Sequence, residues 1–423
     1  MLQVPGEKGF CRVAEVSKTD LHLIEKFQRE VLGLSDLETI TEDHLVAIKH
    51  AGGNVIVARL NEDIDPEILG FAAYTPSVSG NLVSVNKVAF GVNPKYENRN
   101  GVEGWLNYSV AVFGDEAVRN LSKGSFSSAS SRVGIRGVTP YSLEILCECD
   151  YPLIEGFQEN IWSYKPLQMR SISQLKSING SGGHIIGARL KDTGNLIGFC
   201  MDTPSIAGGN LGRYSIIAGV DPNYQNMDVG YQLKLFQMEL ALSSGARFID
   251  WTFDPLQSRN AYFNIEKLGA TISNYTPKYY RNAGGGLNNG LDADRVVAVV
   301  GLNSERLVSS VNRENKEHNL QEYHKLLKTK EVASFFMYGD LKEKFNYVIP
   351  HGDLDFSDTG KIAIEVPYDI GKIAKDVTFI AKDWQTYLRQ AFAQVFNTGY
   401  IVTGFITTKE GIPRSYYLLT KKN

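Results

Sequence analysis

Residues 181–206 read SGGHIIGARLKDTGNLIGFCMDTPSI, and residues 51–78 read AGGNVIVARLNEDIDPEILGFAAYTPSV. The similarity continues into IIAGVDPNYQN and VAFGVNPKYEN, which end at Asn226 and Asn98, an offset of 128 residues. A fixed offset between similar segments is the signature of an internal repeat. The sequence therefore predicts two copies of one structural unit.

Each copy has the same order of predicted elements. An opening strand and a helix precede a hairpin of two short β-branched strands, NVIVARL with ILGFAAY in the first copy and HIIGARL with LIGFCMD in the second. A third strand ends at Val92 or Val220. In the second copy the next segment has apolar residues at the spacing of an amphipathic helix, namely Val229, Leu233, Phe236 and Leu240.

The copies diverge after this point, which suggests how the chain is divided. We expect a degenerate or truncated first copy over residues 1–120, a Ser-rich linker over 121–135 and a complete second copy over 136–302. Residues 303–346 are charged and predict a helical connector, and 347–423 predict a small α/β extension of a strand, a helix and two strands. The predicted fold class is α+β, with tandem mixed sheets flanked by helices.

Composition narrows the functional classes. Forty-four Lys and Arg residues against 47 Asp and Glu residues give a net charge of −3, which argues against nucleic acid as the main partner. The 43% of hydrophobic residues is enough for sizeable cores. No window is apolar and long enough for a membrane span and no signal-peptide core is present, so we expect a cytoplasmic protein. The sequence does not indicate an oligomeric state.

The four cysteines are too few and too scattered for a disulfide framework. Cys147 and Cys149 are two residues apart, a spacing that holds a metal only when further ligands lie nearby. We therefore expect no metal site.

The order of elements resembles the GNAT superfamily of N-acyltransferases. The run FIDWTFDPLQSRNAYFNIEKLGA, residues 248–270, is similar to a GNAT subgroup that transfers succinyl groups from succinyl-CoA to amino acids. The resemblance covers about residues 137–420 and includes IEVPYDI and the Tyr-rich end of the chain. It implies an acyl-CoA donor, with a succinyl or acetyl group, and a small-molecule amine as acceptor.

The resemblance also implies a cofactor site. GNAT proteins cradle the pyrophosphate of CoA on a loop of the form [Q/R]-x-x-G-x-[G/A] at a helix N-terminus. Here the loop corresponds to residues 225–230, QNMDVG, with Asp228 in place of the middle glycine. Either Asp228 turns outward or caps the helix and CoA still binds, or the fold has lost its donor. The implied cofactor-binding residues are Val220, Gln225, Asp228, Val229, Gly230, Tyr231 and Asn264.

In the first copy, residues 97–102 align with this loop only loosely. We therefore expect no CoA binding there and interpret the first copy as a structural half that packs against the second.

Acyl transfer to an amine also requires groups that remove and supply protons. The family's usual acid, a tyrosine, aligns with Ile265, so Asn260 and Tyr262 are the substitute candidates. Asp202 and Asp254 are the candidate bases. Each of them, like the neighbouring Asp250, Tyr214 and Ser215, also fits a structural role at a strand end, and His184 fits a polar turn residue.

The sequence therefore favours an acyl-CoA-dependent N-acyltransferase. Two alternatives stay open. A carrier-protein or aminoacyl-tRNA donor would remove the need for a regular pyrophosphate loop, and a non-catalytic binding module would need neither the loop nor the acid.

Overall fold

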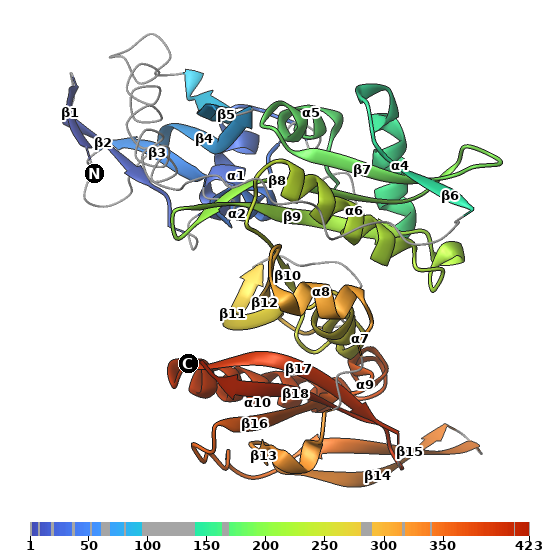
Figure 1. Ribbon diagram of the computed structural model, residues 1–423. Coiled ribbons are helices and arrows are strands. Elements are labelled where there is room, and N and C mark those ends of the chain that lie inside the picture. The colour runs from blue at the N-terminus through green and yellow to red at the C-terminus, as the bar shows by residue number, and fades with distance from the viewer. Residues whose placement is uncertain are drawn as a thin grey trace. The chain divides into compact units, whose positions relative to one another are not determined.

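The computed structural model describes residues 2–6, 9–17, 21–35, 39–50, 53–60, 68–79, 82–94, 140–162, 169–280, 290–314, 318–338, 341–409 and 411–422. The chain divides into two compact units, Met1–Ile249 and Asp250–Asn423 (Figure 1). The predicted linker and the first copy's counterpart of the cofactor loop lie outside the described residues.

Unit 1 contains an antiparallel sheet built from the first copy. Its strands follow one another in sequence order, β1 (Leu2–Gly6), β2 (Gly9–Glu15), β3 (Asn54–Leu60), β4 (Ile68–Ser79) and β5 (Leu82–Val92). Two helices, α1 (Leu21–Glu30) and α2 (Glu42–His50), lie between β2 and β3 in sequence. The predicted strand NVIVARL coincides with β3.

The second copy in unit 1 repeats this order. It consists of β6 (Tyr141–Ile145), α4 (Tyr151–Trp162), α5 (Ile172–Gly180), β7 (His184–Leu190), β8 (Leu196–Ala207), β9 (Asn210–Val220) and α6 (Val229–Ser243), and it leads into β10 (Phe248–Phe253). Strands β6 to β9 pair as antiparallel neighbours.

The two sheets share local irregularities at equivalent positions. One register shift interrupts the β4–β5 pairing at Val88, and one interrupts the β8–β9 pairing at Ile216, 128 residues later. Such β-bulges bend a strand and redirect its side chains. In both copies the bulge therefore lies in the third strand of the hairpin region.

A buried glutamine fixes the entry to the second helix in each copy. Gln28 Nε2 donates to Ile40 O and Gln28 Oε1 accepts from Ile40 N, both at 2.9 Å. Gln158 makes the same pair of bonds with Arg170, at 3.1 and 2.7 Å. Each glutamine is 130 residues from its counterpart and satisfies both backbone groups of one loop residue, so α2 and α5 begin in the same way.

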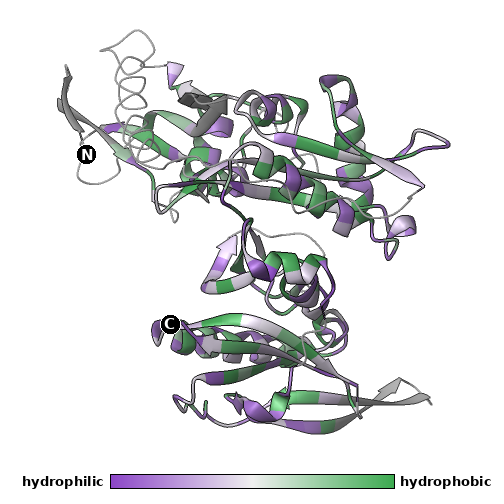
Figure 2. Cartoon of the chain, viewed as in Figure 1, coloured by the Kyte–Doolittle hydropathy of each residue, from purple (hydrophilic) through white to green (hydrophobic). Residues whose placement is uncertain are grey.

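The core of the second copy lies on both faces of its sheet. Helices α4 and α5 cover one face with Tyr151, Leu175 and Phe199 in the shared cluster, while α6 covers the other with Val229 and Leu233. These helices alternate between hydrophobic and hydrophilic residues (Figure 2), as amphipathic helices on a sheet do.

Unit 2 joins the end of the second copy to the C-terminal extension through one sheet. Its strand order is β13-β16-β18-β17-β11-β12-β10. The strands are β11 (Thr271–Tyr280), β12 (Ala293–Gly301), β13 (His324–Lys325), β16 (Lys361–Pro367), β17 (Tyr400–Thr408) and β18 (Arg414–Lys421). The helices are α7 (Ser258–Tyr262), which runs into a π-helix (Phe263–Lys267), α8 (Glu305–Val311), α9 (Ile370–Asp376) and α10 (Thr378–Asn397).

The predicted helical connector over residues 303–346 is wrong for most of its length. Helix covers only α8, whereas β14 (Thr329–Tyr338) and β15 (Leu341–Pro350) form an antiparallel hairpin. The charged residues suggested a helix, but aromatic and β-branched residues between them, such as Phe335 and Val348, favour strands.

Among the described residues, no helix combines the length and the apolar character that crossing a bilayer requires.

Candidate functional site

The candidate cofactor loop connects β9 to α6. A short 3-10 turn, Pro222–Tyr224, follows β9 and is capped by Asp221, whose Oδ1 accepts from Asn223 N at 2.8 Å. Gln225 folds back, and its Nε2 donates to Val220 O at 3.4 Å. The loop is thus anchored to the end of β9 before it enters the helix.

Two non-glycine residues of this loop have left-handed backbone. Asn226 has a φ of 66° and Asp228 a φ of 58°. Asn and Asp are the side chains that tolerate this region best after glycine. Asp228 therefore holds the backbone conformation that glycine adopts most easily, at the position where the family motif has its glycine.

Asp228 is the N-cap residue of α6, yet its side chain makes no capping hydrogen bond, and the residue is exposed. Of the two orientations expected for a loop that still binds CoA, the structure has the outward one. Its charge stands close to the helix N-terminus, where the phosphates of a bound CoA would be held.

The first turn of α6 packs against the sheet. Val229 and Tyr231 are buried, and Val229 belongs to the same hydrophobic cluster as Val220. A Cβ added to Gly230 would lie 3.4 Å from Val220 Cγ2, an ordinary contact distance. The helix N-terminus is therefore held rigidly, with its amide groups directed toward the loop.

Asp202, the first candidate base, forms a buried ion pair. Arg213 Nε donates to Asp202 Oδ1 at 2.8 Å, Arg213 Nη2 donates to the same oxygen, and the backbone N–H of His184 donates to it at 3.3 Å. Burial raises the pKa of Asp202, but the charge of Arg213 and the contact with His184 outweigh it and lower the pKa below its ordinary value. A carboxylate held in this state is a weak proton acceptor.

A buried lysine that the sequence analysis did not single out lies on α6. Lys234 Nζ donates to Ser215 Oγ at 2.9 Å and to Gln237 Oε1 at 2.8 Å. Its charge is felt by buried Cys200, although burial still raises the pKa of that thiol to about 12. Cys200 is therefore protonated and unreactive at neutral pH. A lysine between Leu233 and Leu235 was the signal in the sequence for this polar cluster.

Asp254, the second candidate base, caps the turn after β10 in unit 2. Its Oδ1 accepts from Leu256 N at 2.9 Å and its Oδ2 from Gln257 Nε2 at 3.4 Å. Burial raises the pKa of Asp254 in spite of the nearby charge of Arg295. A raised pKa suits a general base better than the lowered pKa of Asp202 does.

The remaining predicted residues of unit 2 differ in exposure. Asn260 and Tyr262 are exposed on α7, with Tyr262 46% exposed. Asn264 is buried in the π-helix, and its Oδ1 accepts from Trp251 Nε1 at 3.2 Å. Ile265, at the family's acid position, is fully buried. Asn260 and Tyr262 are therefore accessible, whereas the amide oxygen of Asn264 is used inside unit 2.

The C-terminal extension braces the turn that carries Asp254. Tyr417 OH donates to Pro255 O at 2.7 Å, and Ser258 Oγ donates to Pro367 O. Tyr417 is fully buried. Residues more than a hundred positions apart thus hold the WTFDPL segment in place.

The structure groups the predicted residues into two sets. Unit 1 contains Asp202, Val220, Gln225, Asp228, Val229, Gly230 and Tyr231, and unit 2 contains Asp254, Asn260, Tyr262 and Asn264. Within unit 1 the loop residues lie together around the start of α6, while Asp202 lies on β8, paired in register with Ser215 of β9.

Cys147 and Cys149, the weak metal candidates, are joined by a disulfide. With Asp150 they form the one group of three metal-ligating side chains that the described part of the chain brings together. Asp150 is itself engaged, since its Oδ1 accepts from Arg189 Nη2 at 2.8 Å and its Oδ2 from Cys147 N at 3.1 Å.

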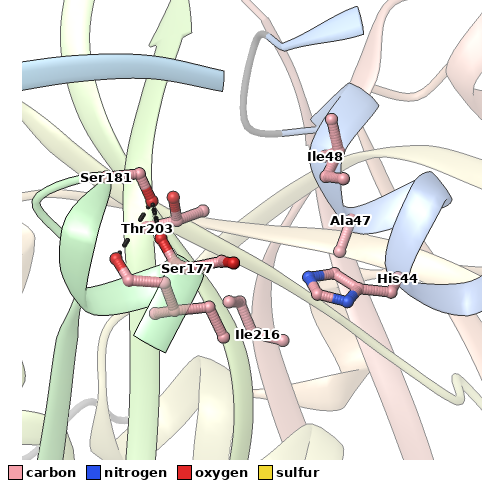
Figure 3. Close-up of a pocket in the computed structure, with 8 residues that line it drawn as sticks. His44, Ala47, Ile48, Ser177, Ser181, Thr203 and Ile216 are labelled. Atoms are coloured by element: carbon pink, nitrogen blue, oxygen red, sulfur yellow. Dashed lines mark hydrogen bonds between the residues drawn. The ribbon is translucent and has the colours of Figure 1, made fainter. Parts of the chain in front are cut away.

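Unit 1 also contains a pocket between its two copies, about 280 Å³ in volume and open to solvent. Helix α2 of the first copy forms one wall, and α5, β8 and β9 of the second copy form the rest (Figure 3). It is lined by His44, Ala47, Ile48, Ser177, Ile178, Ser181, Thr203 and Ile216.

No protein-family model matches the chain, and no curated protein matches it. Part of the chain is similar to solved acetyltransferase structures. The ribosomal-protein-S18-alanine N-acetyltransferase from Escherichia coli matches at 14% identity and a TM-score of 0.32, over 38% of this chain and 94% of that chain. A GNAT-family acetyltransferase from Streptococcus pneumoniae matches at 13% and 0.30, over 38% and 99%. A Salmonella typhimurium protein solved with its cofactor acetyl-CoA matches at 13% and 0.32, over 40% and 96%. At such identities and scores, these matches do not assign an activity to this chain.

Proposed function

We propose that this protein is a GNAT-type N-acyltransferase that moves an acyl group from acyl-CoA to the amine of a small molecule such as an amino acid. The observation that carries the proposal is the β9–α6 loop, where Asn226 and Asp228 hold left-handed backbone directly before the N-terminus of a long helix. Such a loop and helix start offer backbone amides to the phosphates of CoA, and the helix dipole favours their negative charge.

The chemistry requires one bond to form and one to break. The amine nitrogen attacks the thioester carbonyl carbon, a new N–C bond forms and the C–S bond breaks. A base takes the proton that the amine loses, and the CoA thiolate gains one. We assign the base to Asp254, whose burial raises its pKa, and the acid to Tyr262, which is exposed next to the buried Ile265 position.

We further propose that the two copies are tandem GNAT-like halves, with the second as the donor-binding half. The matching bulges at Val88 and Ile216 and the matching bonds of Gln28 and Gln158 support this arrangement. Succinyl is the acyl group that the resemblance of residues 248–270 implies, and acetyl is the alternative.

The first test is the thermal stability of the purified full chain with CoA, acetyl-CoA and succinyl-CoA. A ligand that binds the native state raises the free energy of unfolding by about 2.7 kcal/mol at a hundred times its Kd, so the midpoint should rise with acyl-CoA. Gly230→Glu should abolish the rise, because a carboxylate at the helix start repels phosphate. Gly230→Ala is the matched control and should retain it, because the added Cβ makes only an ordinary contact with Val220. A folded protein whose midpoint ignores every thioester would refute the donor proposal.

A second prediction concerns the departure from the family motif. Asp228→Gly should strengthen acyl-CoA binding about fivefold to tenfold, because it removes a negative charge beside the phosphates and places glycine at a left-handed φ. Asp228→Asn separates the two effects, since Asn tolerates the same backbone without the charge. Calorimetric titration with succinyl-CoA measures both variants. Unchanged or weaker affinity in both would show that phosphates do not lie at this loop.

One observation favours a different class of function. Ile265 is fully buried at the position of the family's acid, and Asp228 keeps a charge at the loop. A GNAT-fold binding module, or a transferase with a carrier-bound donor, requires neither group. Failure of every CoA thioester in the stability test, with the fold intact, would move the assignment to this second candidate.

A further inference from the structure

The pocket between the two copies of unit 1 contains a histidine that no catalytic argument has used. His44 is 3% exposed, and its Nδ1 is buried with no hydrogen-bond partner among the described residues. Figure 3 shows its ring extending from α2 toward Ser177 and Ile216 of the second copy. An unpaired buried polar atom is costly unless something pairs with it, so the ring is a candidate for ligand contact.

The ring is neutral under physiological conditions. Burial, reinforced by the charge of Arg170, lowers the pKa of His44 well below its ordinary value. A neutral imidazole has one donor nitrogen and one acceptor nitrogen.

The other polar groups of the pocket present acceptors. Ser177 Oγ donates its proton to Ser173 O at 3.0 Å, and Ser181 Oγ donates its proton to Ser177 O at 2.9 Å. Because a hydroxyl has one proton, only lone pairs remain on both oxygens to face a ligand. The pocket residues on α2 and α5 also lie toward the C-terminal ends of those helices, where the dipole is negative. A ligand that brings N–H donors satisfies this arrangement.

The charge and shape of the walls narrow the ligand further. No carboxylate lines the pocket, and Arg170 acts on its histidine, so a cation finds no counter-ion there. The apolar walls, which include Ala47 and Ile216, suit aliphatic carbon. The walls thus favour an uncharged N–H donor on a short alkyl chain.

The pocket lies on the same strand as the candidate donor loop. Ile216, the bulged residue of β9, lines the pocket, and Val220 ends that strand four residues later, about 13 Å away at 3.3 Å per residue. Both features belong to unit 1.

We propose that this pocket binds the primary amine of the acyl acceptor in its uncharged form, with His44 Nδ1 accepting a hydrogen bond from the amine N–H. The identification of this amine as the acceptor rests on the proposed acyltransferase function, whereas its binding does not. The first copy then has a definite purpose, because it supplies the positioning residue that completes a site of the second copy. The uncharged amine is also the form that attacks a thioester.

The test uses 2,2,2-trifluoroethylamine, a primary amine that is uncharged at pH 7.5, with ethylamine as its cationic counterpart and trifluoroethanol as its hydroxyl analogue. Fluorine NMR measures binding to the full chain, and nitrogen NMR of ¹⁵N-histidine-labelled protein reports the Nδ1 of His44, assigned by its loss in His44→Leu. We expect saturable binding of trifluoroethylamine that moves the Nδ1 resonance, with affinities at least about tenfold weaker for the other two probes.

Variants make the result specific. His44→Leu should abolish the binding, and the milder Ser177→Ala should weaken it about fivefold, which guards against a misfolded His44 variant. His351→Gln, at an exposed histidine of unit 2, should change nothing. Absence of saturable binding, equal binding of ethylamine, or full binding by His44→Leu would overturn the proposal.

The same preparations separate this proposal from the donor proposal. If trifluoroethylamine fails while succinyl-CoA still raises the thermal midpoint, the pocket assignment is wrong and the donor site stands. If trifluoroethylamine binds through His44 while no acyl-CoA binds, the amine pocket stands and the transferase assignment falls.

Discussion

Arg213→Met is expected to destabilise the protein by about 3–5 kcal/mol at pH 7, the usual cost of leaving one member of a buried ion pair without its partner. Arg213 is 3% exposed and Asp202 is fully buried. Asp202 Oδ2 has no hydrogen-bond partner within the described residues, so Arg213 supplies most of the compensation for the carboxylate. Urea denaturation of the full chain measures the loss.

The pH dependence of this loss has a definite sign. In the wild type the folded pKa of Asp202 lies below its unfolded value, so the ion pair stabilises the fold above about pH 4 and is lost as the pH falls through the folded pKa. Without Arg213, burial raises the pKa of Asp202, and protonation relieves the unpaired charge. The difference between wild type and variant should therefore shrink from pH 7 to pH 4.

The double variant Asp202→Asn/Arg213→Met is the control. It has no buried charge to leave unpaired, so it should recover part of the stability and lose the pH dependence of the single variant. A loss that is the same at every pH, or a double variant less stable than the single one by the full sum, would contradict the ion-pair account of Asp202.

Gly183→Val is expected to cost about 3 kcal/mol or more, because the chain has no room for any side chain there. A Cβ at Gly183 would lie 2.4 Å from Asp202 O and 2.6 Å from Ile178 O, both backbone atoms that cannot move aside alone. Thermal or urea unfolding of the full chain measures the change.

The first copy offers the same test, and a helix offers the control. A Cβ at Gly53 would lie 2.2 Å from Tyr74 O and 2.9 Å from Ile48 O, so Gly53→Val should be similarly destabilising. A Cβ at exposed Gly156 in α4 meets nothing within 4 Å, so Gly156→Ala should stabilise by about 0.5–1 kcal/mol. A neutral Gly183→Val would show that α5 does not approach β8 as closely as the structure has it.

Much of the local structure was predictable because it depends on neighbouring residues. HIIGARL is β7 and NVIVARL is β3, since short β-branched runs carry their own strand preference. The apolar spacing from Val229 to Leu240 lies within α6. The left-handed Asp228 follows from the motif that it interrupts, because that position favours glycine.

The features that could not be predicted depend on contacts between distant residues. Asp202 reads as a free carboxylate until the β8–β9 register brings Arg213 beside it. His44 gains a role only when the first copy packs against the second, and no periodicity in the sequence reports that packing. The pairing of β17 with β11, which joins the C-terminal extension to the end of the second copy, is likewise a long-range contact. The hairpin of β14 and β15 was missed because charge was weighted above strand preference.

The most direct test of the central claim is amide hydrogen exchange of the full chain with and without saturating succinyl-CoA. If the β9–α6 loop holds the phosphates, peptides covering residues 220–233 should gain protection of at least about tenfold, because ligand-bound amides open less often. Peptides covering the disulfide turn at residues 147–150 should not change. Binding of succinyl-CoA with protection elsewhere and none over residues 220–233 would contradict the donor site assigned to this loop.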